Sequence, residues 1–429
     1  MSPKPYLPPF VSYVRGQLCA GDVPLEQIAN DIGTPCFVYQ TRTIDAAYQE
    51  MTRALSFRHH MIAYALKANS TLGVLRHLKA LGAGADIVSG GELARALYAG
   101  FPNERIVFSG VGKTEAELVS AIQARIHAIH VESEAELYTV SRLAKQLHTT
   151  VPIALRVNPD IDAVTHPYIS TGLHSTKFGI DTDLARRLLP FILSESGALE
   201  LRTLACHIGS QLSSPEPLRD AVEVVARLAS EFVAAGAPIR AIDAGGGWPI
   251  GYGDEAHPYP GFQAFGQAIE EGLLRGGAQN MPLDIQVEPG RSLVGQAGIL
   301  LTRVILLKQQ QQKHFVVVDA AMTELLRPAL YQAHHTIVSA KEPLTKEPWT
   351  VSDVVGPVCE TADFLALDRP LPPLAEGDVL AVTNAGAYAA SMASNYNSRL
   401  RPAEVLVTDH GIDVIRRRES YDDLWRLET

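Results

Sequence analysis

The chain has 429 residues, of which 46% are hydrophobic and 20% are charged, and its formal net charge is −10. This is ordinary globular composition, and the usual domain size predicts about two or three domains for such a length. The negative charge argues against nucleic acid or an anionic membrane as the main partner. The four cysteines, Cys19, Cys36, Cys206 and Cys359, are too few and too scattered for a disulfide framework or a metal site.

The N-terminal segment MSPKPYLPPF lacks the charged and then apolar layout of a signal peptide, and no apolar run approaches the length of a membrane span. The few, scattered cysteines also suit a reducing compartment. We therefore expect a soluble, cytoplasmic protein without a membrane partner. Residues 1–40 predict a short strand, a helix from Pro24 to Asp31 and a strand at CFVYQ. A polar-faced helix is expected from Thr41 to Arg58.

A regular alternation of strands and helices follows. Apolar, β-branched runs that end in polar or glycine residues alternate with segments of helical period, which is typical of βα units and a parallel sheet. The number of units and their span match a (β/α)₈ barrel, with a doubly wound open sheet as the alternative. The predicted strands are Met61–Lys67, Ala85–Ser89, Ile106–Ser109, Ala128–Glu132, Pro152–Asn158, Leu201–His207, Ile239–Asp243 and Leu283–Glu288.

After Arg291 the alternation stops. Residues 297–308, 314–319, 349–355, 379–384 and 404–418 alternate and are rich in Val, Leu and Thr, and only Met322–Ala333 resembles a helix. We expect a β-sandwich or β-barrel here, completed by the N-terminal segment. The predicted domains are therefore a barrel at 41–296 and a β domain made of 1–40 and 297–429.

Lys67 is the only lysine of the run MIAYALKANS. It is the last residue of a predicted buried strand, at the open end of a barrel or parallel sheet. An amine that loses hydration there is more easily deprotonated and can attack a carbonyl carbon. The alternative is a lysine whose stem lies along the strand end with its charge in water.

Three further features lie where predicted strands end. The glycines 245–247 allow backbone N–H groups to surround a phosphate, and Gly290-Arg291 at the next strand end strengthens that hypothesis. Glu288 needs a partner if it is buried: either Arg291, in a local ion pair, or the ring nitrogen of pyridoxal phosphate. His207 is either a core histidine or a ring that lies flat on a cofactor.

These residues carry a family resemblance. The segments YALKANS, HPYISTGLHSTKFGI, CHIGSQ, DAGGGW, VEPGRSLVG, ELLRPALYQAHH, GPVCETAD and NAGAYAASMASNYNSRLRPAEVLV occur in matching order over nearly the whole chain. The sequence thereby resembles the fold-type III pyridoxal-phosphate decarboxylases, and within them the diaminopimelate decarboxylase family. The resemblance implies a barrel joined to a β domain, pyridoxal 5′-phosphate as cofactor, and a homodimer with shared active sites. One departure is Trp248-Pro249, where the family more often has Leu-Gly.

The resemblance also implies roles for single residues. Lys67 would form the Schiff base with the cofactor, His207 would stack on its ring, and Cys359 of the partner subunit would donate a proton to the substrate carbon. The implied cofactor-binding residues are Lys67, His207, Ser210, Gly246, Gly247, Glu288, Gly290, Arg291 and Tyr388. The implied substrate-binding residues are Arg291, Arg327, Tyr331, Glu360 and Tyr388.

The substrate class also has a physical argument. Arg327 and Tyr331 are four residues apart and therefore share one face of a helical turn, where they offer a planar guanidinium and a hydroxyl to a carboxylate. Glu360 can hold an ammonium group. Together they describe a substrate whose remote end carries both charges, such as meso-2,6-diaminopimelate, which decarboxylation would convert to L-lysine and CO₂ in the last step of lysine biosynthesis.

Three other functions stay open at this point. A decarboxylase of the same fold could act on carboxynorspermidine or a D-amino acid. An alanine racemase is disfavoured because the racemases of this fold place an arginine where this chain has Glu288. A catalytically inactive, decarboxylase-like regulator is disfavoured because Lys67 and Cys359 are both present.

Overall fold

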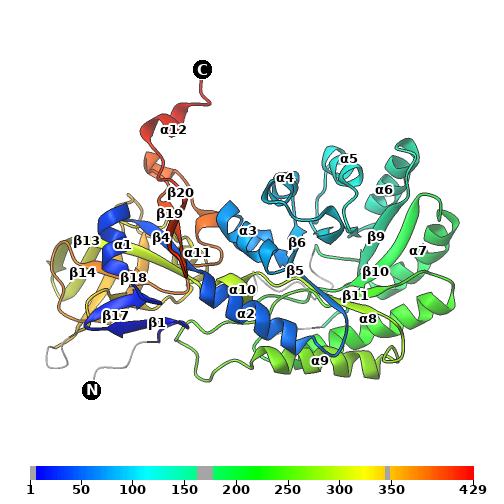
Figure 1. Cartoon of the computed structure of the whole chain (residues 1–429), viewed down its shortest axis with the longest axis horizontal. Helices are drawn as coiled ribbons and strands as arrows, with labels where there is room; N and C mark the ends of the chain where they lie inside the picture. Colours follow the sequence, from blue (N-terminus) through cyan, green and yellow to red (C-terminus); the bar gives the residue numbers. More distant parts are fainter. Residues whose placement is uncertain (1–5, 162–176, 344–347) are drawn as a thin grey trace. The chain divides into compact units, whose positions relative to one another are not determined.

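The computed structural model describes residues 6–161, 177–343 and 348–429 (Figure 1). Most of the segment HPYISTGLHSTKFGI (166–180) therefore lies outside the described residues. The chain divides into two compact units, Met1–Ala46, Ile250–Pro258 and Leu293–Thr429 in one, and Ala47–Pro249 and Tyr259–Ser292 in the other. The domain division predicted at residues 41 and 296 stays a prediction.

The unit of residues 47–249 and 259–292 is a closed barrel of eight strands, each paired in parallel with its neighbours. The predicted (β/α)₈ fold is confirmed, and the open-sheet alternative is wrong because β9 and β10 close the ring. The strands are β5 (His60–Ala65), β6 (Gly84–Ile87), β7 (Ile106–Phe108), β8 (Ala128–Val131), β9 (Val151–Arg156), β10 (Leu199–Ala205), β11 (Ala241–Asp243) and β12 (Asp284–Val287).

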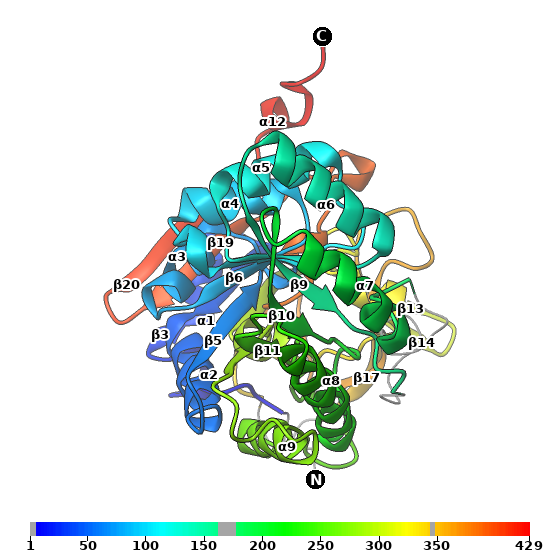
Figure 2. The ribbon, with the colours of Figure 1, turned by 90° about the vertical axis from the view of Figure 1, so that its right-hand side faces the viewer.

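Helices surround these strands, as Figure 2 shows for α3 to α9. Side-chain caps fix where four of them begin: Ser89, Thr114, Ser133 and Asp181 each accept a hydrogen bond from the backbone N–H three residues on. The helices are α2 (Thr41–Ala54), α3 (Leu72–Ala80), α4 (Gly90–Ala99), α5 (Glu115–Ala124), α6 (Glu134–Gln146), α7 (Thr182–Ser194), α8 (Glu216–Ala234), α9 (Phe262–Arg275) and α10 (Arg291–Val294).

The other unit is mostly sheet. Its main path runs β17-β16-β14-β13-β4-β19-β20, and β18 joins this sheet through β13 and pairs with β15. Strand β4 (Cys36–Gln40) lies between β13 and β19, so the N-terminal segment supplies an interior strand. The remaining strands are β1 (Val11–Val14), β2 (Gln17–Ala20), β3 (Val23–Pro24), β13 (Gly298–Gln310), β14 (Lys313–Val318), β15 (Ile337–Ser339), β16 (Thr350–Val355), β17 (Phe364–Leu371), β18 (Val379–Val382), β19 (Ala403–Thr408) and β20 (Gly411–Arg416).

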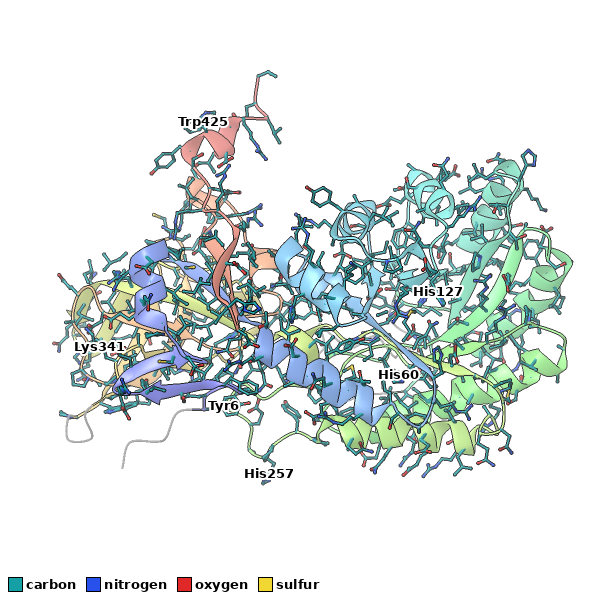
Figure 3. All side chains as sticks on the ribbon, viewed as in Figure 1. Tyr6, His60, His127, His257, Lys341 and Trp425 are labelled. Atoms are coloured by element: carbon teal, nitrogen blue, oxygen red, sulfur yellow. The ribbon has the colours of Figure 1, made fainter. Side chains whose placement is uncertain are left out.

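Helices are few among the described residues of this unit: α1 (Leu25–Ile32), α11 (Arg327–Tyr331) and α12 (Tyr421–Trp425), which carries the half-exposed Trp425 labelled in Figure 3. The predicted helix at Met322–Ala333 is thus shorter than expected, because Pro328 starts a single turn that ends at Gln332 in the left-handed region. The glutamine run forms a hairpin turn, since Gln310 pairs with Lys313 across β13 and β14. No helix among the described residues is long and apolar enough to cross a membrane.

Candidate active site

The sequence-predicted residues of the barrel gather at one end of it, because each follows the carboxyl end of a parallel strand. Lys67 lies in a short 3₁₀ turn (Leu66–Ala68) after β5, and His207 lies two residues after β10. Glu288 directly follows β12. Arg291 begins α10, and its Nη2 donates a hydrogen bond to Ser210 Oγ at 3.2 Å. The barrel therefore brings together Arg291 and Ser210, two predicted residues that are far apart in the chain.

Lys67 is paired with a buried carboxylate. Its Nζ lies 3.3 Å from Asp86 Oδ2, and the hydroxyl of Ser109 donates to the other oxygen of Asp86. The Asp86 side chain is fully buried, whereas that of Lys67 is 39% exposed. The lysine is more exposed than a strand end predicts, because β5 stops at Ala65 and the turn carries Lys67 outward.

Two hydrogen bonds to side chains hold the glycine turn (residues 245–247) that follows β11. Its first amide, Gly245 N–H, donates to Asp243 Oδ1 at 2.8 Å, and Gly246 N–H donates to His207 Nδ1 at 3.0 Å. Burial lowers the pKa of His207 well below its usual value, so the ring is neutral and Nε2 carries its proton. A hydrogen bond from Gly246 N–H to a phosphate would therefore compete with the bond that this N–H makes to His207 Nδ1.

Close backbone approach explains why this turn uses glycine. A Cβ at Gly246 would lie 2.3 Å from the Glu288 carbonyl oxygen, and a Cβ at Gly247, where φ is +94°, would lie 2.3 Å from that of Gly209. Trp248, the departure from the family pattern, is buried and stacks on Phe265 of α9, with ring centroids 5.4 Å apart. It therefore anchors the turn to the helix that follows.

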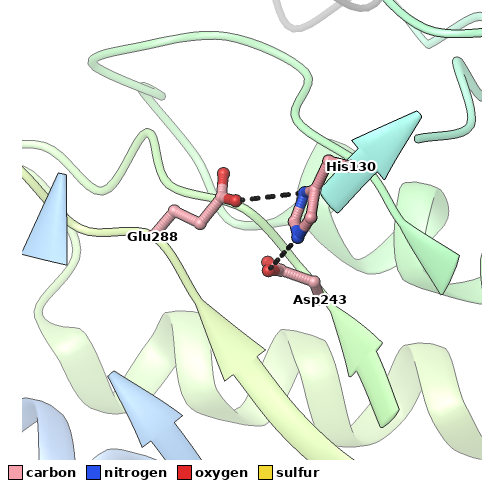
Figure 4. A group of neighbouring side chains, drawn as sticks. All are labelled: His130, Asp243 and Glu288. Carbon is pink, nitrogen blue, oxygen red and sulfur yellow. Dashed lines mark ion pairs between the residues drawn. The ribbon is translucent and has the colours of Figure 1, made fainter. Parts of the chain in front are cut away.

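Glu288 belongs to a buried cluster with His130 and Asp243, shown in Figure 4. The His130 Nδ1 atom lies 3.5 Å from Glu288 Oε1, and its Nε2 atom lies 4.0 Å from Asp243 Oδ2. A second buried pair joins Arg156 Nη1, at the end of β9, to Glu132 Oε1, directly after β8, at 2.6 Å. The sequence analysis did not single out His130, although a lone histidine in the apolar strand AIHV is a signal for it.

The β unit holds the predicted substrate residues other than Arg291. Arg327 is buried, and its guanidinium lies 4.7 Å from the centre of the Tyr252 ring. Its Nη1 lies 2.8 Å from His335 Nε2, and His335 Nδ1 lies 2.9 Å from the Thr383 carbonyl oxygen. A carbonyl only accepts, so Nδ1 carries the proton and Nε2 accepts from Arg327. His335, which the sequence analysis also missed, thereby fixes the orientation of Arg327.

Cys359 and Glu360 lie on an exposed loop of the same unit. The backbone N–H of Cys359 donates to Asn397 Oδ1 at 3.2 Å, and the hydroxyl of Tyr396 donates to Glu360 Oε1 at 2.5 Å. Tyr388 is half-buried and has a φ of +56°. These residues belong to the β unit, and the predicted site residues that follow the barrel strands belong to the barrel unit.

The comparisons with known proteins agree with this arrangement. A family model described as the pyridoxal binding domain of pyridoxal-dependent decarboxylases matches residues 41–295. The chain belongs to this class of decarboxylases, which use pyridoxal phosphate. Diaminopimelate decarboxylase of Vibrio cholerae is 46% identical over 96% of this chain and 97% of its own length, and that of Pseudomonas aeruginosa is 47% identical over 97% and 98%.

Solved structures give the same result. The diaminopimelate decarboxylase of Helicobacter pylori complexed with L-lysine is 42% identical, with a TM-score of 0.88, over 94% of this chain and 98% of that chain. The enzyme of M. jannaschii in complex with L-lysine is 36% identical, with a TM-score of 0.92, over 98% and 97%. Within the pyridoxal-dependent decarboxylases, the chain belongs to the diaminopimelate decarboxylase family.

The residues present fit the cofactor of this class. Glu288 Oε1 is buried and makes no hydrogen bond within the part of the chain that the structure describes, as suits a partner for a ring nitrogen. The glycine turn leaves no room for a Cβ, as suits a closely held phosphate. Lys67 offers the only lysine amine in the segment MIAYALKANS. Each group sits where a barrel strand ends.

We expect Gly247→Ala to weaken cofactor binding. The added Cβ meets the Gly209 carbonyl oxygen, and the residue has a φ that alanine adopts at a cost of about 1–3 kcal/mol, so the affinity for pyridoxal phosphate should fall roughly 10- to 100-fold. Equilibrium titration followed by cofactor fluorescence measures this. Gly112→Ala is the matched control, because nothing lies within 4 Å of a Cβ there. An unchanged affinity would contradict the prediction.

We expect Lys67→Ala to remove the visible absorbance of lysine-bound cofactor and to lower turnover by about a thousandfold or more, because no amine then attaches the aldehyde. Absorbance spectra of the purified protein and rate assays measure the two effects. The exposed Lys79 of α3 serves as the control, replaced in the same way. Retention of the absorbance in the Lys67 variant would refute the role.

Proposed function

We propose that this chain decarboxylates meso-2,6-diaminopimelate to L-lysine and CO₂, the last step of lysine biosynthesis. The observation that carries the proposal is the full-length similarity to diaminopimelate decarboxylases, two of which were solved with L-lysine. The arrangement of Lys67, Glu288 and the glycine turn at one end of the barrel supports the same chemistry.

Pyridoxal phosphate, when bound, supplies a ring that accepts the electron pair left when the bond from Cα to the carboxylate breaks. Lys67 provides the amine that attaches it, and Asp86 holds that amine in place at 3.3 Å. The neutral His207, fixed by Gly246 N–H, would stack on the ring. Glu288 would keep the ring nitrogen protonated. The phosphate would be held by Arg291, Ser210, Gly246, Gly247 and Gly290.

Residues of the β unit are proposed to select the substrate. Arg327 binds the remote carboxylate, with its guanidinium oriented by His335 and Tyr252. Tyr331 and Tyr388 add hydroxyl groups, and Glu360 holds the remote ammonium group. A substrate that ends in a bare cation would be repelled by Arg327, which disfavours lysine, ornithine and arginine as substrates.

Cys359 is proposed to donate a proton to the substrate carbon after CO₂ leaves. It lies on an exposed loop, as suits a residue that reaches the active site of a partner subunit. We therefore propose a homodimer in which each active site combines residues of both subunits. The proposed compartment is the cytoplasm, which would keep this thiol reduced.

Product analysis tests the proposed function. Incubation with meso-diaminopimelate and pyridoxal phosphate should yield L-lysine and CO₂ in equal amounts, whereas ornithine, arginine and carboxynorspermidine should react far more slowly. Arg327→Leu should lower kcat/KM for diaminopimelate roughly 10- to 200-fold, because a charged hydrogen bond contributes about 1.5–3 kcal/mol. A faster reaction with carboxynorspermidine, or an unaffected variant, would overturn the substrate assignment.

Cys359→Ala should lower kcat by about 10²–10⁴-fold and leave the cofactor affinity unchanged, because it removes a proton donor and no cofactor contact. Steady-state kinetics and cofactor titration separate the two. Mixing this variant with Lys67→Ala should then restore activity, because a hybrid dimer contains one site with both residues intact. Unchanged turnover in Cys359→Ala rules out the donor role, and no recovery on mixing rules out sharing between subunits.

A further inference from the structure

His130 lies within 4.0 Å of both carboxyl groups of the buried cluster shown in Figure 4. It projects from β8, whereas Asp243 ends β11 and Glu288 follows β12. The side chains are 1%, 0% and 7% exposed, in that order. Among the described residues, His130 Nε2, Asp243 Oδ2 and Glu288 Oε1 make no hydrogen bond to any group outside the cluster. These polar atoms are therefore oriented toward one another.

The charges around the cluster determine its protonation. The cations near it are Lys67, Lys113 and Arg156, and the other titratable neighbours include Asp86, His127 and the Cys206 thiol. Burial, together with those cations, lowers the pKa of His130 well below its usual value. Burial also raises the pKa of Asp243 to about 7, and burial and the Asp243 charge raise that of Glu288 well above its usual value. A neutral imidazole thus lies between two carboxyl groups that hold protons near neutral pH.

The position of the hydrogen on that imidazole decides which carboxyl group can become negative. A neutral histidine donates from one nitrogen and accepts at the other. If the hydrogen is on Nδ1, then Nδ1–H faces Glu288 Oε1 at 3.5 Å, and the lone pair of Nε2 faces Oδ2 of the Asp243 carboxylic acid at 4.0 Å. The other oxygen of Asp243 already accepts from Gly245 N–H. In the opposite tautomer, Nε2–H would favour a negative Asp243 and leave a nitrogen lone pair against Glu288 Oε1. Only the first arrangement stabilises a negative charge on Glu288 alone.

We propose that His130 is a positioning residue that keeps the proton on Asp243 and donates Nδ1–H to Glu288, so that Glu288 alone becomes negative when it gives its proton to the cofactor ring nitrogen. In that step the O–H bond of Glu288 breaks, its electron pair stays on the carboxylate, and the nitrogen lone pair forms the new N–H bond. Asp243 and His130 keep their protons. The inference rests on the proposed role of Glu288.

The test measures the protonation of the ring nitrogen in the holoenzyme reconstituted with ¹⁵N-labelled pyridoxal phosphate, by NMR across a pH series. In the wild type the ring nitrogen should stay protonated through neutral pH. His130→Leu removes the donor to Glu288 and the acceptor for Asp243, so the midpoint for loss of the ring proton should fall by about one pH unit, a tenfold change. His130→Asn retains a donor and an acceptor and should recover part of the shift.

Two further variants test whether Asp243 is neutral and whether the effect is specific to His130. Asp243→Asn mimics the protonated acid, because its amide can donate to Nε2, and should leave the midpoint within a few tenths of a unit. His127→Leu is the control, since His127 (Figure 3) contacts the Glu104 carbonyl oxygen and Gln286 rather than the carboxyl groups, and should also leave it unchanged. A shift in Asp243→Asn as large as in His130→Leu would overturn the neutral state of Asp243.

Wild-type protein alone gives a second test. Side-chain ¹⁵N NMR of the histidines, with the His130 signals identified by their absence in His130→Asn, should show Nδ1 protonated and Nε2 unprotonated. An imidazolium or the Nε2–H tautomer would overturn the inference even if His130→Leu fails to fold. An unprotonated ring nitrogen in the wild type would refute the role of Glu288, whereas a protonated ring that is insensitive to His130 would refute only the role of His130.

Discussion

The structure of the barrel depends on how it neutralises the charges buried where its strands end. A lone charge in a protein interior is costly, so each buried ionisable group must pair with an opposite charge or share a proton. Lys67 pairs with Asp86, and Arg156 pairs with Glu132. Asp243 and Glu288 are both acids, and each lies near a neutral histidine instead of a cation. The cluster around Glu288 is therefore the part of this region whose protonation has to be controlled.

Backbone contacts hold these groups at fixed positions. The glycine turn after β11 lies so close to the backbone after β10 and β12 that side chains would collide with carbonyl oxygens there. The amide of Glu288 donates to the Gly245 carbonyl at 2.8 Å, and that of Leu212 donates to the Gly247 carbonyl at 2.9 Å. The turn thus ties three strands together and sets the distance between His207 and Glu288. Trp248 secures it from the side of α9.

The β unit contains a buried cation of its own, Arg327. Arg327 is buried next to an aromatic face and a histidine acceptor. These contacts orient the guanidinium. A buried arginine arranged in this way suits the recognition of an anion, which is the chemistry that the diaminopimelate carboxylate requires.

The sequence by itself determined the strands of the barrel and the residues at their ends. Apolar runs that end in polar residues mark buried parallel strands, and the ends of such strands meet at one rim, so Lys67, His207 and Glu288 could be placed together. It also located the β strands after Arg291, but missed β15 and β17 and lengthened the turn at α11, where Pro328 overrides the apolar pattern.

Only the tertiary structure decided which polar side chains face one another. His130 and Glu288 come from β8 and β12, far apart in sequence, and whether their side chains point to the same interior depends on the closure and register of the whole barrel. The contact of Arg327 with His335 and Tyr252 likewise depends on how the β unit folds around three separate segments. The local hydrophobic pattern determines whether a segment is a strand or a helix and which of its residues are buried. The partners of a buried charge are determined by packing between distant segments.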